Sequence, residues 1–491
     1  MNCRQNLPRI LQLACMATLS LCALQAQAWA VRALPPHGAG AGAGATVTRP
    51  VPAGSPSQCT EVAAASAAKI DKAADKSLQG TNAATAETVD PLGQLQMLVR
   101  ESARRSAEVG AAKLLAEAAD FDVDEVVASK RPQVTLYGST ALGQTAITGR
   151  SSLNGLQANV GVNVGAPLYD GGRLQALTNW RTRLADAAKL GQGATQERVA
   201  LEAVNTALER HRYRMQTQIY QQYVRKMGCL VEALEHIVAE DKGRMSELVQ
   251  ARKSQQQAEL QREQAMSTTR QFEIRLRKLV GEQVLVGDGI SSPLMATPNL
   301  DDVQRLVEKS NDLQQMLVEV DAQQHYAEAV ASGSKPQLNW TMGKSVSRLP
   351  GSTTNAMSVG VQASWSIYNG GAQESSTKAA LKRAEAARKG YEEALASKLS
   401  KVAEGHDAAL SAFDRAKRMV DVLRDSDKVR SYTFQQWSQL GRRSLFDVMS
   451  AEGDHFAQRV AYINALVDGA QANASLRSQG MGLLNWMQVK P

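Results

Sequence analysis

Aromatic residues are scarce in this chain of 491 residues, because Phe, Trp and Tyr together make up only 4% of it. Such bulky side chains dominate the cores of large globular domains, so their scarcity argues against a core of that kind. The chain is rich in Ala and Gln instead. This composition is typical of long helices that pack closely along their length.

Cysteine is also rare, with five residues in the whole chain. Three of them fall within the first 30 residues, which leaves Cys59 and Cys229. Two cysteines so far apart in sequence do not form a disulfide framework, and we expect each to be a spare thiol.

The motifs of catalysis and of cofactor binding are missing. The six histidines show neither an HExxH motif nor a zinc-binding Cys/His spacing. Gly343-Lys344-Ser345 is similar to the end of a P-loop, but Leu338 stands where the first glycine is required. There is no GxSxG motif and no dinucleotide fingerprint. We therefore expect no enzymatic activity and no bound metal or cofactor.

Neither the charge nor the hydropathy of the chain is concentrated in one segment. The formal net charge of +8 is spread thinly, and no Lys/Arg block is interleaved with aromatic residues, so we expect no nucleic-acid partner. Beyond the N-terminus no apolar run approaches about 18 residues, which predicts no membrane-spanning helix. If this chain enters a membrane, it must do so as β-strands.

The N-terminus has the pattern of a secretory signal peptide, which we assign to residues 1–30. Two arginines precede a mostly apolar run at 10–24, and small residues suited to cleavage end at Ala28 or Ala30. The mature protein is therefore expected to leave the cytoplasm.

The segment 31–90 follows the signal peptide, and its first half is rich in Pro, Gly and Ala. Such a composition buries too little apolar surface to order itself. We expect a disordered leader here.

Two long stretches contain no proline, one between Pro167 and Pro293 and the other between Pro350 and Pro491. Apolar residues inside them recur in alternating steps of four and three, the spacing of a coiled coil. About 70 residues separate Gly172 from Gly243, enough for about 105 Å of helix. Two short amphipathic helices in a bundle are the alternative interpretation. The apolar positions are Tyr220, Val224, Met227, Val231, Leu234 and Val238, and in the second stretch Ala409, Phe413, Ala416, Val420 and Leu423.

A period of two precedes each helical stretch, at 158–168 and at 357–367. An upstream partner strand begins at Arg131 in RPQVTLYGSTALG and at Lys335 in KPQLNWTMGKSVS. Each has one apolar face and roughly the length of a tilted strand that crosses a bilayer. Alternation also fits a soluble sandwich, but four strands are too few for one. They are also too few to close a barrel, so several chains would have to share it.

A four-residue phrase marks the change from the period of a strand to that of a helix. It occurs twice, 199 residues apart. Tyr suits a membrane interface, Asp or Asn can cap a helix, and Gly-Gly permits the turn. The residues of these two joints are Tyr169, Asp170, Gly171 and Gly172, and Tyr368, Asn369, Gly370 and Gly371.

A second repeated phrase marks the middle of each helical stretch. Gly243 and Gly441 lie 198 residues apart, as do Ser246 and Ser444. We interpret each phrase as the tip of a helical hairpin, with Gly ending one helix and Ser capping the next. The chain is thus one structural unit twice, at 91–290 and 291–485, each with a helix, a β-hairpin and a long helical hairpin.

These motifs resemble those of the TolC-like outer-membrane channel proteins, the outer-membrane factors of Gram-negative efflux and secretion machines. The resemblance covers roughly residues 90–490. It rests on RPQ and KPQ before strands, on PLYDGG and IYNGG after them, and on GRRSLFDVMSAEGDHFAQRVAYINAL in the last hairpin. This last segment is similar to the type I secretion branch of the family.

The resemblance implies a mixed, mostly α fold that assembles as a homotrimer. Four transmembrane β-strands per chain contribute to one shared 12-stranded barrel in the outer-membrane lipid, antiparallel coiled-coil hairpins form a periplasmic tunnel, and the segment near 281–310 belongs to an equatorial belt. The implied function is the exit duct of a tripartite system with a periplasmic membrane-fusion adaptor and an inner-membrane ABC transporter. The expected cargo is a protein such as a repeat-type toxin or adhesin. The alternatives are multidrug efflux and, in another class, a periplasmic coiled-coil adaptor or scaffold.

The resemblance also implies that the tunnel closes at its periplasmic tip through polar contacts and an acidic ring. The family's tip arginine falls on Arg443 and its first ring aspartate on Asp447. The second ring aspartate is replaced by Ser450 and the gate tyrosine by Ser438. Glu247 lies near the position of the acidic salt-bridge partner. The alternative for Arg443 and Asp447 is a solvated helix end. The candidate tip residues are Gly243, Arg244, Ser246, Glu247, Gly441, Arg443, Ser444 and Asp447.

Overall fold

The computed structural model describes residues 90–145, 153–282, 290–349, 352–480 and 482–489. They all belong to one compact unit of the chain, Cys59–Pro491. The predicted signal peptide at 1–30 and the leader at 31–90, apart from Asp90, lie outside the described residues.

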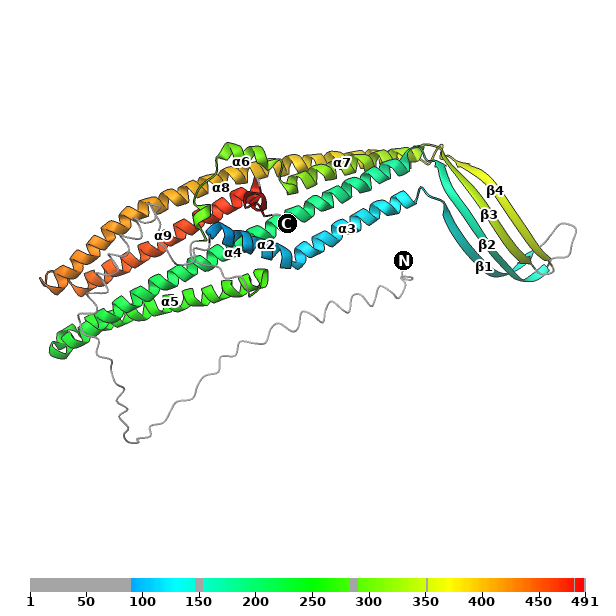
Figure 1. Cartoon of the computed structure of the whole chain (residues 1–491). Coiled ribbons are helices and arrows are strands. Elements are labelled where there is room, and N and C mark those ends of the chain that lie inside the picture. The colour runs from blue at the N-terminus through cyan, green and yellow to red at the C-terminus, as the bar shows by residue number, and fades with distance from the viewer. Residues whose placement is uncertain (1–89, 146–152, 283–289, 350–351, 481, 490–491) are drawn as a thin grey trace, which may run out of the picture. The chain divides into compact units, whose positions relative to one another are not determined.

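The described chain is mostly helical and contains one small antiparallel sheet, so the predicted fold class is confirmed (Figure 1). The helices are α2 (Pro91–Arg105), α3 (Ala107–Ala128), α4 (Arg173–Glu240), α5 (Met245–Val280), α6 (Leu300–Val307), α7 (Asn311–Ala331), α8 (Ala372–Ser438), α9 (Leu445–Gln479) and α10 (Leu483–Trp486), with 3-10 turns η1 (Lys242–Arg244), η2 (Ser292–Leu294) and η3 (Ser332–Ser334). The strands are β1 (Gln133–Thr145), β2 (Leu153–Tyr169), β3 (Gln337–Leu349) and β4 (Ser352–Ser364).

The four strands lie in the order β1-β2-β3-β4, with every neighbouring pair antiparallel. The pairing of β2 with β3 joins the two halves of the chain in one sheet, and the register shifts once between Pro167 and Tyr169. β4 ends at Ser364, so the prediction of a strand as far as Ile367 is wrong by three residues. The reason is that β3 begins at Gln337, opposite Ser364, and offers no partner beyond it.

The predicted long helices form without a break. α4 has 68 residues and α8 has 67, which corresponds to about 100 Å each. The alternative of short bundle helices is therefore wrong. In α4 the coiled-coil positions from Val224 to Val238 are buried against neighbouring helices. α4 packs along α5 and α8 packs along α9, so each is one arm of a helical hairpin.

The helices next to the sheet follow the order of the strands. α3 packs on α4, α4 on α7, and α7 on α8, while α4 and α9 bring the two hairpins together (Figure 1). None of the described helices is both long enough and apolar enough to cross a membrane. Cys229 on α4 is disulfide-bonded, so the prediction of a spare thiol there is wrong; its partner cysteine lies outside the described residues.

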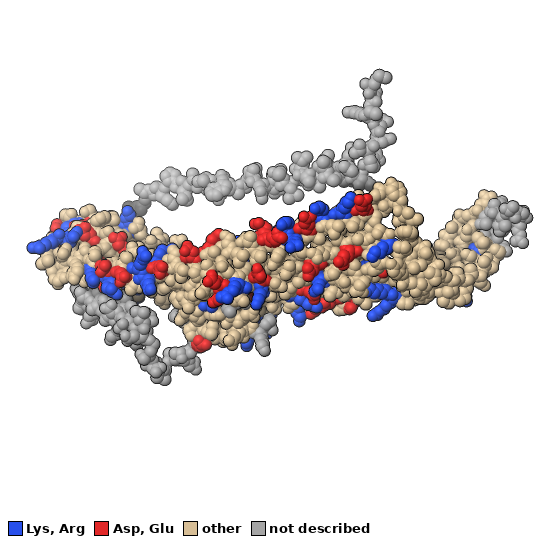
Figure 2. All heavy atoms as spheres, turned by 90° about the horizontal axis from the view of Figure 1, so that it is seen from above, with Lys and Arg blue, Asp and Glu red and all other residues tan. Residues whose placement is uncertain are grey.

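The sheet has one uncovered apolar face. Alternation and register put Leu136 of β1, Val160 of β2, Met342 of β3 and Val359 of β4 on the same side, and their exposed fractions run from 41% to 72%. The four described strands contain only two charged residues, Lys344 and Arg348. By contrast, Figure 2 shows acidic and basic side chains interspersed along the helices.

Candidate functional site

The first strand-to-helix joint turns on two glycines in the left-handed region, Gly171 with φ 67° and Gly172 with φ 88°. Gly172 N donates a hydrogen bond of 3.0 Å to Asp170 Oδ1, and Leu174 N donates to the other carboxylate oxygen. The Asp170 side chain therefore caps the first turn of α4. A residue with a Cβ would strain both glycine positions.

The second joint repeats this backbone. Gly370 has φ 68° and Gly371 has φ 83°, and Gln373 N donates to Asn369 Oδ1 at 3.2 Å. The two phrases thus fold into the same turn with the same kind of side-chain cap, and the predicted change from strand to helix takes place at both.

The tip of the second hairpin carries the predicted cap. Gly441 has φ 59° after α8 ends, and Ser444 is the N-cap residue of α9. Asp447 N donates to Ser444 Oγ at 3.2 Å, and Ser444 N donates to Asp447 Oδ2 at 3.0 Å. Hydrogen bonds from the Ser444 backbone and hydroxyl, with the nearby charge of Arg443, lower the pKa of Asp447. This reciprocal arrangement is a capping box.

The tip of the first hairpin differs from the prediction. α4 ends at Glu240, and the Asp241 side chain accepts a hydrogen bond of 3.0 Å from Gly243 N. Gly243 lies in the turn η1, while Ser246 lies inside the first turn of α5 and does not cap it. The expected Ser cap is therefore wrong here, because α5 begins at Met245, before Ser246, and its N-cap residue Arg244 has no side-chain capping hydrogen bond, while Asp241 caps the preceding turn η1.

The two tips make separate polar contacts in the chain. Arg244 Nη2 donates to Glu247 Oε2 at 2.8 Å, and Arg443 Nε donates to Gln436 Oε1 at 3.3 Å. Within the described chain Glu247 therefore pairs with Arg244 of its own turn, and the expected pair between Glu247 and Arg443 is not formed.

An apolar cluster holds the tips of the two hairpins together. Leu445, Val448 and Met449 of α9 pack with residues of α4 and α5 such as Leu234 and Leu248. All of them are at most 6% exposed. Burial of apolar surface stabilises a contact by roughly 25 cal/mol per Å². Separation of the tips would expose this cluster to water and is therefore unfavourable.

A buried ionic cluster lies beside this apolar core. Glu452 of α9 is 1% exposed, and its carboxylate is 3.5 Å from Lys226 Nζ of α4 and 3.6 Å from Arg430 Nη1 of α8. Burial raises the pKa of Glu452, and the two cations oppose that shift. Removal of the Glu452 carboxylate would take from Lys226 the acidic partner that it has in the described chain, whereas Arg430 would keep Asp427, so the loss at Lys226 is the destabilising one.

His455 lies one turn further along α9 and is 4% exposed. Its Nδ1 is 3.3 Å from Ser426 Oγ of α8. Burial, together with the charges of Arg430 and Arg459, lowers the pKa of His455 to about 4. The ring is therefore neutral at pH 7 and would resist protonation.

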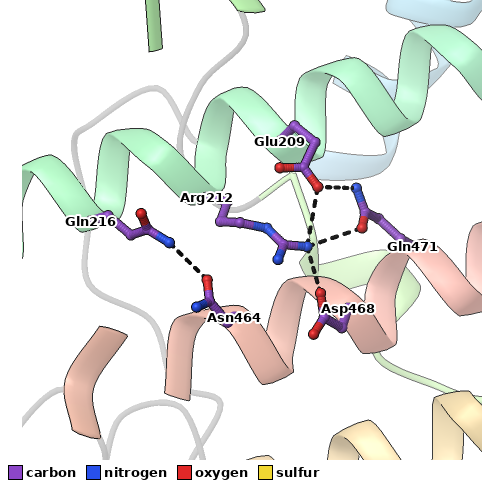
Figure 3. A network of polar contacts seen from close by, with 6 residues as sticks. All are labelled: Glu209, Arg212, Gln216, Asn464, Asp468 and Gln471. Carbon is purple, nitrogen blue, oxygen red and sulfur yellow. Dashed lines mark hydrogen bonds and ion pairs between the residues drawn. The ribbon is translucent and has the colours of Figure 1, made fainter. Parts of the chain in front are cut away.

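The α4–α9 seam is our name for the contact between these two helices. Figure 3 shows its central polar network, in which Arg212 Nη2 contacts Asp468 Oδ1 at 2.6 Å, Glu209 Oε1 at 3.2 Å and Gln471 Oε1 at 3.0 Å. Gln471 Nε2 also donates to Glu209 at 2.8 Å. Gln216 Nε2 donates to Asn464 Oδ1 at 2.7 Å beside it (Figure 3). The two hairpins are thus joined here by polar contacts.

The residues of this seam were not predicted from the sequence. Glu452 falls at a position of α9 where the buried residues Leu445, Met449 and Phe456 mark the inward stripe. An acidic residue in such a stripe was the available signal, since a buried carboxylate needs a partner. Among the described residues, no group of three or more His, Cys, Asp or Glu side chains is arranged to hold a metal ion.

The chain thus combines a small antiparallel sheet with two helices of about 100 Å, α4 and α8, each paired with a shorter helix. The model of the outer membrane efflux protein family matches residues 98–282 and 303–479. The chain belongs to this family. It is an outer-membrane efflux channel protein with a periplasmic helical tunnel, which is a transporter class and not an enzyme class.

Solved structures of such proteins share the fold at low sequence identity. A membrane protein from Pseudomonas aeruginosa has 16% identity and a TM-score of 0.71, with 81% of this chain and 96% of that chain covered. The outer membrane protein VceC from Vibrio cholerae has 15% identity and a TM-score of 0.68, with 79% of this chain and 97% of that chain covered. The open state of the MtrE outer membrane channel of Neisseria gonorrhoeae has 15% identity and a TM-score of 0.67, with 83% of this chain and 95% of that chain covered. No curated protein sequence matches the chain.

Proposed function

We propose that three copies of this chain form the exit duct of a tripartite export system. The four strands of each copy would contribute to one shared 12-stranded barrel in the outer membrane. The observation that carries this proposal is the sheet itself, which has two open edges and an uncovered apolar face. A bilayer does not tolerate open strand edges, and closure needs about eight strands or more.

The helical hairpins would line the periplasmic tunnel and present their tips to a membrane-fusion adaptor. An inner-membrane ABC transporter, or another inner-membrane pump, would supply the energy. Under this proposal residues 91–290 and 291–485 are two structural repeats. Arg443 and Asp447, with the first-tip residues Arg244 and Glu247, would constrict the tunnel at its tip.

The cargo that we propose is a protein, such as a repeat-type toxin or adhesin, exported by type I secretion. Support for this cargo is the phrase from Gly441 to Glu452, which is similar to that branch of the family. The second candidate is efflux of small molecules, which the description of the matching family favours.

The proposal predicts that the detergent-purified protein is a trimer and conducts ions in a planar bilayer. A purified protein that is monomeric and shows no conductance would contradict the proposed exit duct. For the cargo, deletion of the gene should abolish export of a protein into the medium and leave drug tolerance unchanged. Raised drug sensitivity with normal protein export would instead establish small-molecule efflux.

A further inference from the structure

The two joints have the same backbone but differ in what covers them. Gly171 is buried, whereas Gly370 is exposed. The preceding tyrosines differ in the same sense, with Tyr169 at 51% and Tyr368 at 86% exposure. The second joint therefore lacks a neighbour that the first joint has.

The neighbour at the first joint is Lys335. Its Nζ donates a hydrogen bond of 2.8 Å to the carbonyl oxygen of Gly171. Its stem lies so close that a Cβ on Gly171 would be 2.6 Å from Lys335 Cβ. No heavy atom of the described residues would lie within 4 Å of a Cβ on Gly370. Positive φ explains the glycine at both joints, but close approach explains only Gly171.

The counterpart of Lys335 in the first half is Arg131. Each stands two residues before a strand, Lys335 before Gln337 of β3 and Arg131 before Gln133 of β1, and each is followed by Pro-Gln. Arg131 is exposed, and within the described chain its guanidinium has no hydrogen-bond or ion-pair partner. It cannot serve Gly370 of its own chain, because β1 and β4 are the opposite edges of the sheet.

The strands show the same missing neighbour. β2 continues to Tyr169 because β3 pairs with it there. β4 stops at Ser364, and all of its residues are exposed. A strand placed on the free edge of β4 would extend it as β3 extends β2.

We propose that the Gly370–Gly371 joint is the binding site for Arg131 of a second copy of this chain. The guanidinium would donate to the Gly370 carbonyl oxygen as Lys335 Nζ does to Gly171, while β1 of that copy pairs with β4. This proposal rests on the proposed shared barrel and names a contact that holds it together.

The internal pairing also gives the register between copies. Within the chain Asn163 pairs with Gly343. The joints are 199 residues apart, and the basic residues before the strands are 204 apart. The equivalent of Asn163 in the second half lies 199 residues later and is Gln362. The equivalent of Gly343 in the first half lies 204 residues earlier and is Ser139. Gln362 should therefore lie opposite Ser139 of the second copy. The same step places Tyr368 opposite Val134.

The register is tested by disulfide trapping in the full-length protein with Cys59 and Cys229 replaced by Ser. The double variant Gln362→Cys with Ser139→Cys should give a covalent oligomer on a non-reducing gel, and each single variant should not. Monomers from the double variant, in a preparation that is trimeric and conducts, would overturn the register.

The Arg131 contact is tested by dissociation of the purified oligomer at a fixed elevated temperature. A charged hydrogen bond is lost at every joint, so Arg131→Ala should dissociate about tenfold faster than the wild type. Arg131→Lys should dissociate as slowly as the wild type, since a lysine makes the equivalent hydrogen bond at position 335. Lys130→Ala is the matched control, because Lys130 Nζ bonds Gln175 Oε1 of its own chain at 3.0 Å.

Equal dissociation rates for Arg131→Ala and Lys130→Ala would overturn the Arg131 contact. If the oligomer still cross-links and conducts in that case, the proposed duct stands without this contact. Absence of any oligomer and of any conductance in the wild-type protein would instead remove the duct, and the Arg131 contact with it.

Discussion

Asp447 is assigned to an acidic ring by resemblance, and it is also half of the capping box with Ser444. The two roles can be separated, because Asn keeps an acceptor for the cap and removes the charge. We predict that Asp447→Asn weakens cation selectivity or divalent-cation block in single-channel recordings. Ser444→Ala should lower thermal stability by about 1 kcal/mol and leave selectivity unchanged. Unchanged currents in Asp447→Asn would reject the ring role.

His455 should make the stability of the tip region depend on pH. Its pKa of about 4 lies below the ordinary value of 6.5, so the unfolded chain takes up the proton first as the pH falls. The resulting stability is full above about pH 6.5 and is lost towards pH 4, by about 3 kcal/mol in all. We predict that thermal unfolding of the purified protein shows this loss and that His455→Gln removes it.

The neighbours of His455 must be considered in that measurement. Burial raises the pKa of Glu452, so protonation of this carboxyl favours the folded state as the pH falls and opposes the effect of His455. The variant Glu452→Gln separates the two contributions. If the wild type and His455→Gln lose stability to the same extent as the pH falls, His455 is not the cause of the loss. The polar and charged groups around the His455 ring and the Glu452 carboxyl are Tyr223, Lys226, Ser426, Asp427, Arg430 and Arg459.

At the level of single residues, the sequence predicted what depends on local backbone chemistry. The left-handed glycines at 171 and 370 and the cap at Ser444 follow from a few neighbouring residues. The first tip was predicted wrongly because a 3-10 turn capped by Asp241 leads into α5, which already begins at Met245 and so includes Ser246 in its first turn. The partners of Glu452 come from two other helices, so no local pattern contained them.

Among the elements, α4 is the clearest case in which absence of proline predicts length. The helix runs for 68 residues and contains glycines that each cost only about 1 kcal/mol. The end of β4 was not predictable in the same way. A strand ends where its partner ends, and the partner of β4 is a segment beginning at Gln337.

The α4–α9 seam carries a prediction at the scale of these elements. The Arg212 side chain is 13% exposed and balances Glu209 and Asp468. We predict that Arg212→Ala destabilises the protein by about 2 kcal/mol in thermal unfolding, because the partly buried carboxylate of Glu209 loses its cation, whereas the exposed Asp468 contributes little. It should also raise the fraction of time that the channel is open.

The control for Arg212 lies on the same helix. Arg183 forms an exposed ion pair with Asp186, and such pairs contribute under about 1 kcal/mol. Arg183→Ala should therefore resemble the wild type in both measurements. Equal effects of the two substitutions would show that the polar network of the seam does not hold the hairpins together.

For the whole molecule, the sequence predicted two copies of one structural unit but not how they join. The repeated phrases at 199 residues show that each half makes the same turn. They do not specify that β2 pairs with β3, because that choice depends on which strand edges meet in three dimensions. The sheet order was therefore available only from the structure.

The two unpaired edges of the sheet also bear on the life of the newly exported chain. β4 is exposed along its whole length, and the apolar side chains of β1 lie open at the opposite edge of the sheet. Free edges of this kind promote pairing with any available strand, including misdirected pairing and aggregation. The chain is thus most at risk between its release into the periplasm and its assembly, and this interval is when a chaperone that shields strand edges would matter most.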